Sequence, residues 1–314
     1  MQEDHIIANG KQRLGATLIR PDGAGPVPAL LFLSGSGPNN RWSETYDFPF
    51  FGELAAGLVA AGYAVLTFDK RGIGQSNGNY EEAGYEDRTS DALAALQWLA
   101  AQPGIDAGRL GLLGHSEGCY VAAIAATRSP LVTYMVWLAP AAESVPAQTV
   151  SEIRNNGRLR GNSARKIAQA VRRNRLRHYL LWLARYSGLG WPVVRLARRR
   201  WPASKLARFS RRWYLIFDFN PRPYLRRLEI PILALFGGLD SVVSPEPNSR
   251  MLWQALPPAG RARLTSHIIP GANHLFWPAV TGGTREWAML EKRFSPDLLP
   301  LICHWLSEQV VDHS

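Results

Sequence analysis

The sequence predicts an α/β fold, built on a mostly parallel sheet with helices on both faces. Strand-like and helix-like segments alternate along most of the 314 residues. The predicted strands are near-continuous apolar runs, which is typical of strands that are buried on both faces. In addition, residues 109–126 read as strand, sharp turn and helix, with Ser116 in the turn between Gly114 and Gly118.

The elements follow one another in a regular order. Residues 5–20 read as two short strands joined by a turn at Asn9 and Gly10. Further strands are predicted at 28–33, 64–68, directly before Ser116, and at 132–138, 230–236 and 264–269. Helices are predicted at 48–61, 87–101, directly after Ser116, and at 245–256 and 296–309. These segments assign residues 1–140 and 226–314 to one core.

Residues 141–225 interrupt this pattern. They show helical, amphipathic periodicity and no strand pattern. One predicted helical face carries Leu176, Tyr179, Leu180, Leu183 and Tyr186, and a second carries Leu206, Phe209, Trp213 and Ile216. Because the segment falls between two predicted strands, we expect it to fold over the strand ends as a helical cap, or lid.

Composition indicates a globular protein. Hydrophobic residues make up 46% of the chain and charged residues 19%. No apolar run approaches the roughly 20 residues that a membrane-spanning helix needs. The first residues, from Met1 to His5, lack the basic start and apolar run of a secretory signal, so a reducing cytoplasm is the expected location. Cys119 and Cys303 are expected to be buried as small hydrophobic residues rather than paired.

Positive charge is concentrated in the predicted cap. Residues 153–217 hold 18 of the 36 Lys and Arg residues and no Asp or Glu, so the rest of the chain carries 18 basic against 25 acidic residues. Three interpretations remain open. The arginines are simply solvated, or they bind an anionic membrane surface together with the cap tryptophans, or they attract an anionic substrate. Nucleic-acid binding is not expected, since no recognised binding motif accompanies the charge.

Ser116 is the candidate nucleophile. A second Gly-x-Ser-x-Gly match surrounds Ser76, between Gly74 and Gly78. Ser76 lies several residues beyond its strand in a glycine-rich loop, and no helix follows. Ser116 has a strand directly before it and a helix directly after it, which is the arrangement that exposes a serine hydroxyl at the edge of a sheet.

The candidate base is His274, because a serine hydroxyl needs an imidazole to remove its proton and His274 directly follows a predicted strand. His267 lies within that strand and His304 within the last helix. His115 precedes the serine, and its side chain is expected to point away from the reacting centre. The remaining histidines, near the termini or in the cap, are His5, His178 and His313.

The candidate acid is Asp240, which follows the strand 230–236 after two glycines. Its role is to fix the imidazole tautomer and stabilise the charged form. Asp69 also follows a strand, but we expect it to pair with Arg71 and brace its loop. Asp218 is a third option. The chain order serine, Asp240, histidine matches one class of hydrolases.

Two backbone N–H groups are candidates for stabilising an oxyanion. The N–H of Glu117 begins the helix after the nucleophile, where the helix dipole favours negative charge. The loop 34–37 can supply a second donor, the N–H of Ser36, although the same loop also reads as a plain glycine turn. It does not read as a phosphate cradle, because no Gly-Lys-Ser/Thr follows.

With these residues in place, the chain resembles the α/β-hydrolase family. The matching parts are Gly-His-Ser-Glu-Gly at 114–118, Gly-Gly-Leu-Asp at 237–240, Gly-Ala-Asn-His at 271–274 and Asp-Lys-Arg-Gly-Ile-Gly-Gln-Ser at 69–76. The resemblance implies an eight-stranded, mostly parallel sheet, no cofactor or metal, and a covalent acyl-enzyme on Ser116. Many members carry a His-Gly pair at the oxyanion loop. Here Ser34 and Gly35 stand there, which leaves the second donor open.

The expected function is that of a serine hydrolase acting on small carboxylic esters, similar to the lid-bearing bacterial esterases and the serine-aminopeptidase-like hydrolases. The same triad also serves amidases and aminopeptidases, and the scaffold does not distinguish them. A non-catalytic protein that binds a membrane surface is the remaining alternative. The sequence leaves the natural substrate and the oligomeric state open.

Overall fold

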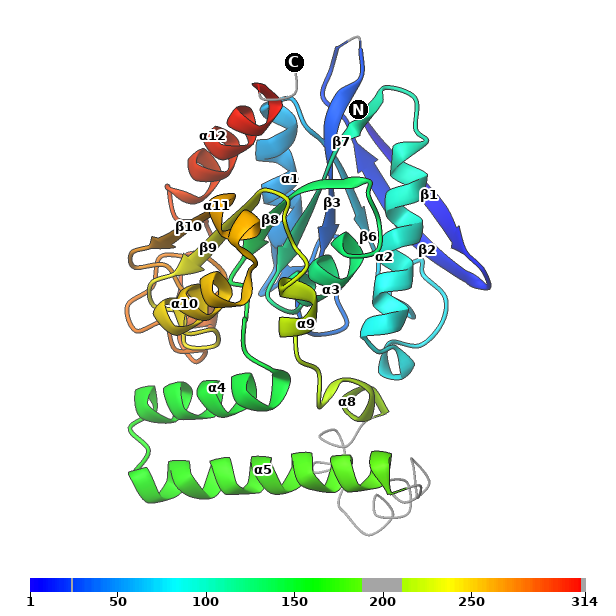
Figure 1. Ribbon diagram of the computed structural model, residues 1–314. Helices are drawn as coiled ribbons and strands as arrows, with labels where there is room; N and C mark the ends of the chain where they lie inside the picture. Colours follow the sequence, from blue (N-terminus) through cyan, green and yellow to red (C-terminus); the bar gives the residue numbers. More distant parts are fainter. Residues whose placement is uncertain (24, 188–210, 312–314) are drawn as a thin grey trace.

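The computed structural model describes residues 1–23, 25–187 and 211–311 (Figure 1). Eight strands form one sheet in the order β1-β2-β6-β3-β7-β8-β9-β10. Their bounds are β1 Gln2–Asn9, β2 Gln12–Ile19, β3 Val27–Leu33, β6 Ala64–Phe68, β7 Ile105–His115, β8 Val132–Leu138, β9 Ile232–Gly237 and β10 Leu264–Ile269. The α/β-hydrolase fold expected from the sequence is confirmed.

The sheet is parallel from β6 to β10, and only the β1–β2 and β2–β6 pairs are antiparallel. All six residues of β9 are buried, as are the last five of β3. Such strands cannot face water on either side, so helices must cover both faces. Because the central strands run parallel, the loops that follow β3, β7, β9 and β10 all leave from the same edge of the sheet (Figure 1).

The helices cover the two faces of the sheet in separate layers. On one face, α1 Phe50–Ala60 and α12 Leu298–Val311 pack against the sheet; on the other lie α2 Tyr85–Ala100, α3 Glu117–Ala126 and α10 Pro245–Ala255. Each layer builds its own apolar core with the side chains of that face. The short elements β4 Glu44–Thr45, β5 Phe48–Pro49, α11 Pro258–Ala262, η1 Tyr80–Glu82 and η3 Trp287–Met289 were not predicted.

The described part of the segment between β8 and β9 is helical, as predicted. It contains α4 Val145–Leu159, α5 Ala164–Tyr186, α8 Arg211–Ile216 and α9 Arg222–Leu225. Helices α4 and α5 lie side by side, apart from the sheet (Figure 1). We call residues 141–225 the insertion, and its boundaries as a separate cap domain stay a prediction.

Helix α5 packs through the face opposite to its predicted apolar face. The buried side chains are Val171, Asn174, His178, Leu181 and Ala184. The predicted face, which includes Leu176, Tyr179 and Tyr186, is largely exposed. In the second predicted set, Ile216 is buried, while Leu206 and Phe209 lie outside the described residues.

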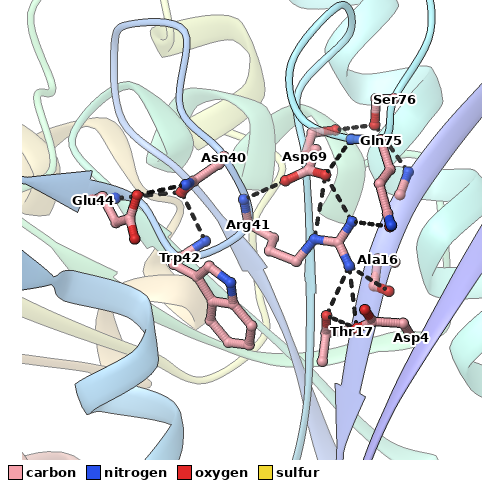
Figure 2. A network of polar contacts seen from close by, with 11 residues as sticks. Asp4, Ala16, Thr17, Asn40, Arg41, Trp42, Glu44, Asp69, Gln75 and Ser76 are labelled. Carbon is pink, nitrogen blue, oxygen red and sulfur yellow. Dashed lines mark hydrogen bonds and ion pairs between the residues drawn. The ribbon is translucent and has the colours of Figure 1, made fainter.

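The predicted pairing of Asp69 with Arg71 is wrong. Asp69 pairs with the buried Arg41, whose Nη2 lies 2.7 Å from Oδ2 and whose backbone N–H donates to Oδ1 at 2.7 Å (Figure 2). Arg71 pairs instead with Asp87 and Asp91 on α2, at 2.8 and 2.7 Å. A turn begins at Lys70, whose carbonyl accepts the Ile73 N–H at 3.0 Å, and the side chains before and after it meet different partners.

In the part of the chain that the structure describes, no helix is both long and apolar enough to cross a bilayer.

Candidate active site

Ser116 stands between β7 and α3 in a strained backbone conformation, with φ 53° and ψ −117°. Residues other than glycine rarely adopt a positive φ, and such strain is concentrated at functional sites. The turn is held by two hydrogen bonds. The Ser116 N–H donates to the Leu138 carbonyl at 2.8 Å, and the Cys119 N–H donates to the Ser116 carbonyl at 3.0 Å. The arrangement is the predicted strand, turn and helix.

The two glycines of the motif allow this turn because the chain passes very close to itself. A Cβ on Gly118 would lie 1.9 Å from the Leu33 carbonyl oxygen, and one on Gly114 would lie 2.8 Å from the Cys119 nitrogen. Both distances are shorter than any real carbon contact. Glycine at 118 therefore lets α3 begin directly against the end of β3.

The structure brings Ser116, His274 and Asp240 together. His274 Nε2 lies 3.0 Å from the Ser116 Oγ, and His274 Nδ1 lies 2.7 Å from the Asp240 Oδ2. The other oxygen of Asp240 accepts the backbone N–H groups of Val242 and Val243 at 2.7 and 2.8 Å. His274 and Asp240 are buried, whereas Ser116 is half-buried.

Two loops that follow adjacent strands hold the acid and the histidine in place. The Leu239 N–H donates to the Ala272 carbonyl at 2.8 Å, which ties the Asp240 loop to the His274 loop. A Cβ on Gly237 would lie 2.3 Å from the Asn273 carbonyl oxygen, so only glycine permits this approach. The fully buried Asn273 side chain accepts the N–H groups of Leu275 and Trp277 at 2.8 and 3.1 Å. Asn273 therefore shapes the turn that presents His274, a role the sequence analysis did not assign.

His115 lies beside His274 and does not point away from it, contrary to expectation. Its Nε2 lies 3.0 Å from the His274 carbonyl oxygen, and the two rings are 5.0 Å apart between centroids. Burial, helped by the nearby His274, lowers the pKa of His115 to about 3. His115 is therefore neutral near pH 7 and supports the histidine turn through a hydrogen bond.

The other candidates lie away from this cluster. Ser76 is buried, where its hydroxyl donates to the Asp69 carbonyl at 2.7 Å and accepts the Gly15 N–H at 2.9 Å. Asp218 accepts a hydrogen bond from Tyr186 at 2.6 Å. His267 lies within β10, as predicted, and is exposed. The second serine motif is thus a structural turn of the loop after β6.

The two predicted oxyanion donors flank the serine. The loop with Ser36 follows β3, and a Cβ on Gly35 would lie 3.4 Å from the Ser116 Cβ, so this loop runs in contact with the serine. The second donor, the Glu117 N–H, belongs to the first residue of α3. Neither N–H donates a hydrogen bond to another described residue, so both remain available to a ligand oxygen.

The Glu117 side chain is buried among cations. Arg88 Nη1 lies 2.8 Å from one of its oxygens, and Arg212 Nη2, from α8, lies 2.7 Å from each. Burial alone would raise the pKa of Glu117, but Arg88 and Arg212 outweigh it and hold the pKa far below its usual value. The carboxylate is therefore ionised at any working pH, and it links α3 to the insertion.

A cavity of about 750 Å³ lies between α4, α5 and α8. Its lining, within the described chain, does not include Ser116 or His274. One lining residue, Glu152, interacts electrostatically with the site. Burial raises the pKa of Glu152, His274 lowers it and Asp240 raises it further. Glu152 is the last acid before residues 153–217, which is the one sequence signal that could have singled it out.

Among the described residues, no group of His, Cys, Asp and Glu side chains is arranged to hold a metal ion.

Comparison with known proteins assigns the chain to a family. The model of the X-Pro dipeptidyl-peptidases (S15 family) matches residues 9–275. Esterase EstD of Thermotoga maritima is 26% identical over 307 residues, which covers 97% of this chain and 67% of EstD.

Solved structures show the same fold at lower identity. A proline iminopeptidase from Mycobacterium smegmatis superposes with a TM-score of 0.63 at 16% identity, covering 99% of this chain and all of that one. Est1E from Butyrivibrio proteoclasticus, solved with ferulic acid, gives a TM-score of 0.57 at 14% identity over 98% of both chains.

Proposed function

The chain belongs to the S15 family within the α/β hydrolases, and we propose that it is a serine hydrolase that cleaves carboxylic esters. The observation that carries the proposal is the hydrogen-bonded series from Ser116 through His274 to Asp240. A strained serine next to a buried histidine and carboxylate has the geometry that general-base activation requires.

In the proposed reaction, Ser116 Oγ attacks the ester carbonyl while His274 Nε2 takes its proton. Asp240 holds the imidazole tautomer and stabilises the imidazolium. The N–H groups of Glu117 and Ser36 accept the negative charge of the tetrahedral oxygen. His274 then gives its proton to the leaving alcohol. A water molecule, activated by the same histidine, hydrolyses the acyl-enzyme and frees the acid.

Two observations favour esters over peptides. EstD, which aligns with 97% of this chain, is named as an esterase. An aminopeptidase or dipeptidyl-peptidase must also bind a cationic amino terminus, and residues 153–217 offer 18 basic side chains and no acidic one. Such an insertion repels cations.

The amidase alternative is supported by the family match itself, since the S15 model describes a peptidase. A side-by-side assay of p-nitrophenyl esters against aminoacyl and X-Pro p-nitroanilides separates the two functions. We expect turnover of the esters, and loss of that turnover by about 10⁴-fold or more in Ser116→Ala, which keeps the fold. Preferential cleavage of the anilides would replace the ester proposal. No turnover of either class would support a non-catalytic role.

We propose in addition that the outer face of α5 binds an anionic bilayer surface. The exposed apolar side chains of this helix are Leu176, Tyr179, Leu180, Trp182 and Tyr186. Tyr179 and Tyr186 lie opposite the packed face, whereas Leu176 and Leu180 also line the cavity between α4, α5 and α8. Arginines neighbour these side chains along the helix. Apolar and aromatic residues with neighbouring cations suit the membrane interface.

Co-sedimentation with liposomes tests this surface. We expect binding to vesicles with phosphatidylserine, weaker binding to phosphatidylcholine alone, and a clear loss in Trp182→Ser. The matched control is Trp253→Ser, because Trp253 is equally exposed (51% against 49%) but lies on α10. Equal recovery with both lipids, or an equal effect of the two variants, would contradict the proposal.

A further inference from the structure

The contacts that hold the loop after β3 converge on one peptide bond, the bond between Gly35 and Ser36. The Gly35 carbonyl oxygen accepts a hydrogen bond from the Asn39 side chain at 2.9 Å, and a second from Lys70 Nζ. Lys70 also donates to the Gly37 carbonyl at 3.1 Å. Two donors on one carbonyl fix the plane of that peptide.

The N–H of the same peptide belongs to Ser36. Because a trans peptide is planar, its C=O and N–H point in opposite directions. Holding the Gly35 oxygen on the side of Lys70 and Asn39 therefore turns the Ser36 N–H away from them. The loop runs in contact with Ser116, so the direction of this N–H decides whether it can serve a tetrahedral oxygen formed there.

A donor that hydrogen-bonds to a carbonyl oxygen also polarises the whole peptide, and a polarised N–H is itself a stronger donor. Lys70 is buried, at 9% exposure, and this burial lowers the pKa of its amino group, with Arg88 and Arg212 adding to the shift and Glu117 opposing it. A buried amino group needs hydrogen-bond partners, and the Gly35 and Gly37 carbonyls supply them here.

The next part of the loop, at Gly37, is linked to Arg88 and Arg212 through Tyr80. The Gly37 N–H donates to the Tyr80 hydroxyl at 2.9 Å. The guanidinium groups of Arg88 and Arg212 each lie 5.0 Å from the Tyr80 ring centroid, and both also bind Glu117. One buried network thus contacts both the loop that carries Ser36 and Glu117, the first residue of α3.

We propose that Lys70 and Asn39 are positioning residues for the oxyanion hole, which orient and strengthen the Ser36 N–H donor through the Gly35 carbonyl. The proposal rests on the proposed function, since it concerns the transition state of that reaction. Neither residue touches the substrate.

The test compares Lys70→Met and Asn39→Ala with the control Lys11→Met, which changes an exposed lysine on the hairpin turn. Rates on a p-nitrophenyl ester are expressed per active site, titrated with a fluorophosphonate. Affinity for a trifluoromethyl ketone, whose hemiketal oxygen mimics the oxyanion, is measured in parallel.

We expect kcat of Lys70→Met to fall on the order of 10²-fold, with KM changed by less than about 2-fold. The inhibition constant of the ketone should rise by the same factor as kcat falls. Asn39→Ala, which removes the neutral hydrogen bonds to the Gly35 and Ser36 carbonyls, should show the same pattern at about 5- to 10-fold. Lys11→Met should behave as the wild type.

If Lys70 only stabilised the fold, the outcome would be different. Lys70→Met would then lower the melting temperature and the titrated fraction, while kcat per active site and the ketone affinity stayed at wild-type values. That result would overturn the inference and leave the ester-hydrolase proposal intact. If Lys70→Met does not fold, Asn39→Ala decides by the same criteria. A wild type that neither turns over esters nor reacts with the fluorophosphonate would overturn both proposals.

Discussion

Asp240 makes no contact with Ser116, so its proposed influence on the reaction passes entirely through His274. Its Oδ2 faces His274 Nδ1 at 2.7 Å, and its Oδ1 is occupied by two backbone N–H groups. An asparagine at this position can still accept the two backbone N–H groups through its Oδ1, but its NH₂ group then faces His274 Nδ1. The imidazole then carries its proton on Nε2, where it cannot accept one from the serine.

We therefore expect Asp240→Asn to lower kcat by about 10⁴-fold with little change in melting temperature. The control is Asp218→Asn, because Asp218 was the alternative acid and bonds only within the insertion. Its rate should stay within about 2-fold of the wild type, since a substitution away from the reacting groups seldom alters the barrier. Equal losses in both variants would argue against the assigned acid.

His115 makes the stability of the protein depend on pH. Its pKa is about 3 in the folded protein, chiefly because of burial, against roughly 6.5 in an unfolded chain. Between these values the unfolded chain binds the extra proton, so stability falls as the pH falls. His178, with a pKa of about 4 caused mainly by burial, acts in the same direction.

Replacing His115 by glutamine removes the proton that the unfolded chain binds at this position. The slope of the unfolding free energy between about pH 4.5 and 6 should become shallower by about 1.4 kcal/mol per pH unit. Urea unfolding at several pH values measures this slope. An unchanged slope would mean that the side chain at 115 is accessible to protons in the folded state.

At the scale of elements, a buried ion pair links α8 to the core, beside the apolar packing of Ile216. Arg212 binds Glu117 through two contacts of 2.7 Å, while its neighbour Arg211 is exposed. Removing one partner of a buried pair is costly because the other charge is left behind, although here Arg88 still faces Glu117.

We expect Arg212→Met to destabilise the protein by about 3 kcal/mol and Arg211→Met by less than about 0.5 kcal/mol. Amide hydrogen exchange should quicken across α8, Arg211–Ile216, in the first variant only. Similar exchange in both variants would show that Arg212 does not hold this helix in place.

Helix α5 shows what periodicity can and cannot predict. The spacing of Leu176, Tyr179 and Tyr186 correctly indicated a helix with one apolar face. It could not indicate which face packs, because α5 carries apolar side chains on two opposite sides. The face that packs meets Phe217 through Leu181 and Ala184, and this contact joins segments that are far apart in the sequence.

At the scale of the whole molecule, the sheet was predictable because each central strand is an uninterrupted apolar run. The three residues of the proposed triad were predictable for a related reason. Ser116 directly follows β7, Asp240 and His274 lie in the loops after β9 and β10, and parallel strands end at one edge. The elements that were missed, such as β4, β5 and α11, are too short to show any periodicity.

The supporting residues could not be predicted in this way. Lys70 contacts a carbonyl 35 positions away, and Arg212 contacts a carboxylate 95 positions away. Such contacts depend on how whole loops and helices meet, and no local pattern encodes them. Lys70 was visible in the sequence only as part of a loop motif, and the partner of Asp69 was assigned wrongly for the same reason.

The chemistry proposed for this fold requires a reactive hydroxyl at one position. Labelling with a fluorophosphonate, followed by peptide mapping, tests it most directly. The account predicts one adduct per chain, on the peptide with Ser116 and none on that with Ser76, and strongly slowed labelling in His274→Ala. An adduct elsewhere, or no adduct on a folded wild-type protein, would contradict it.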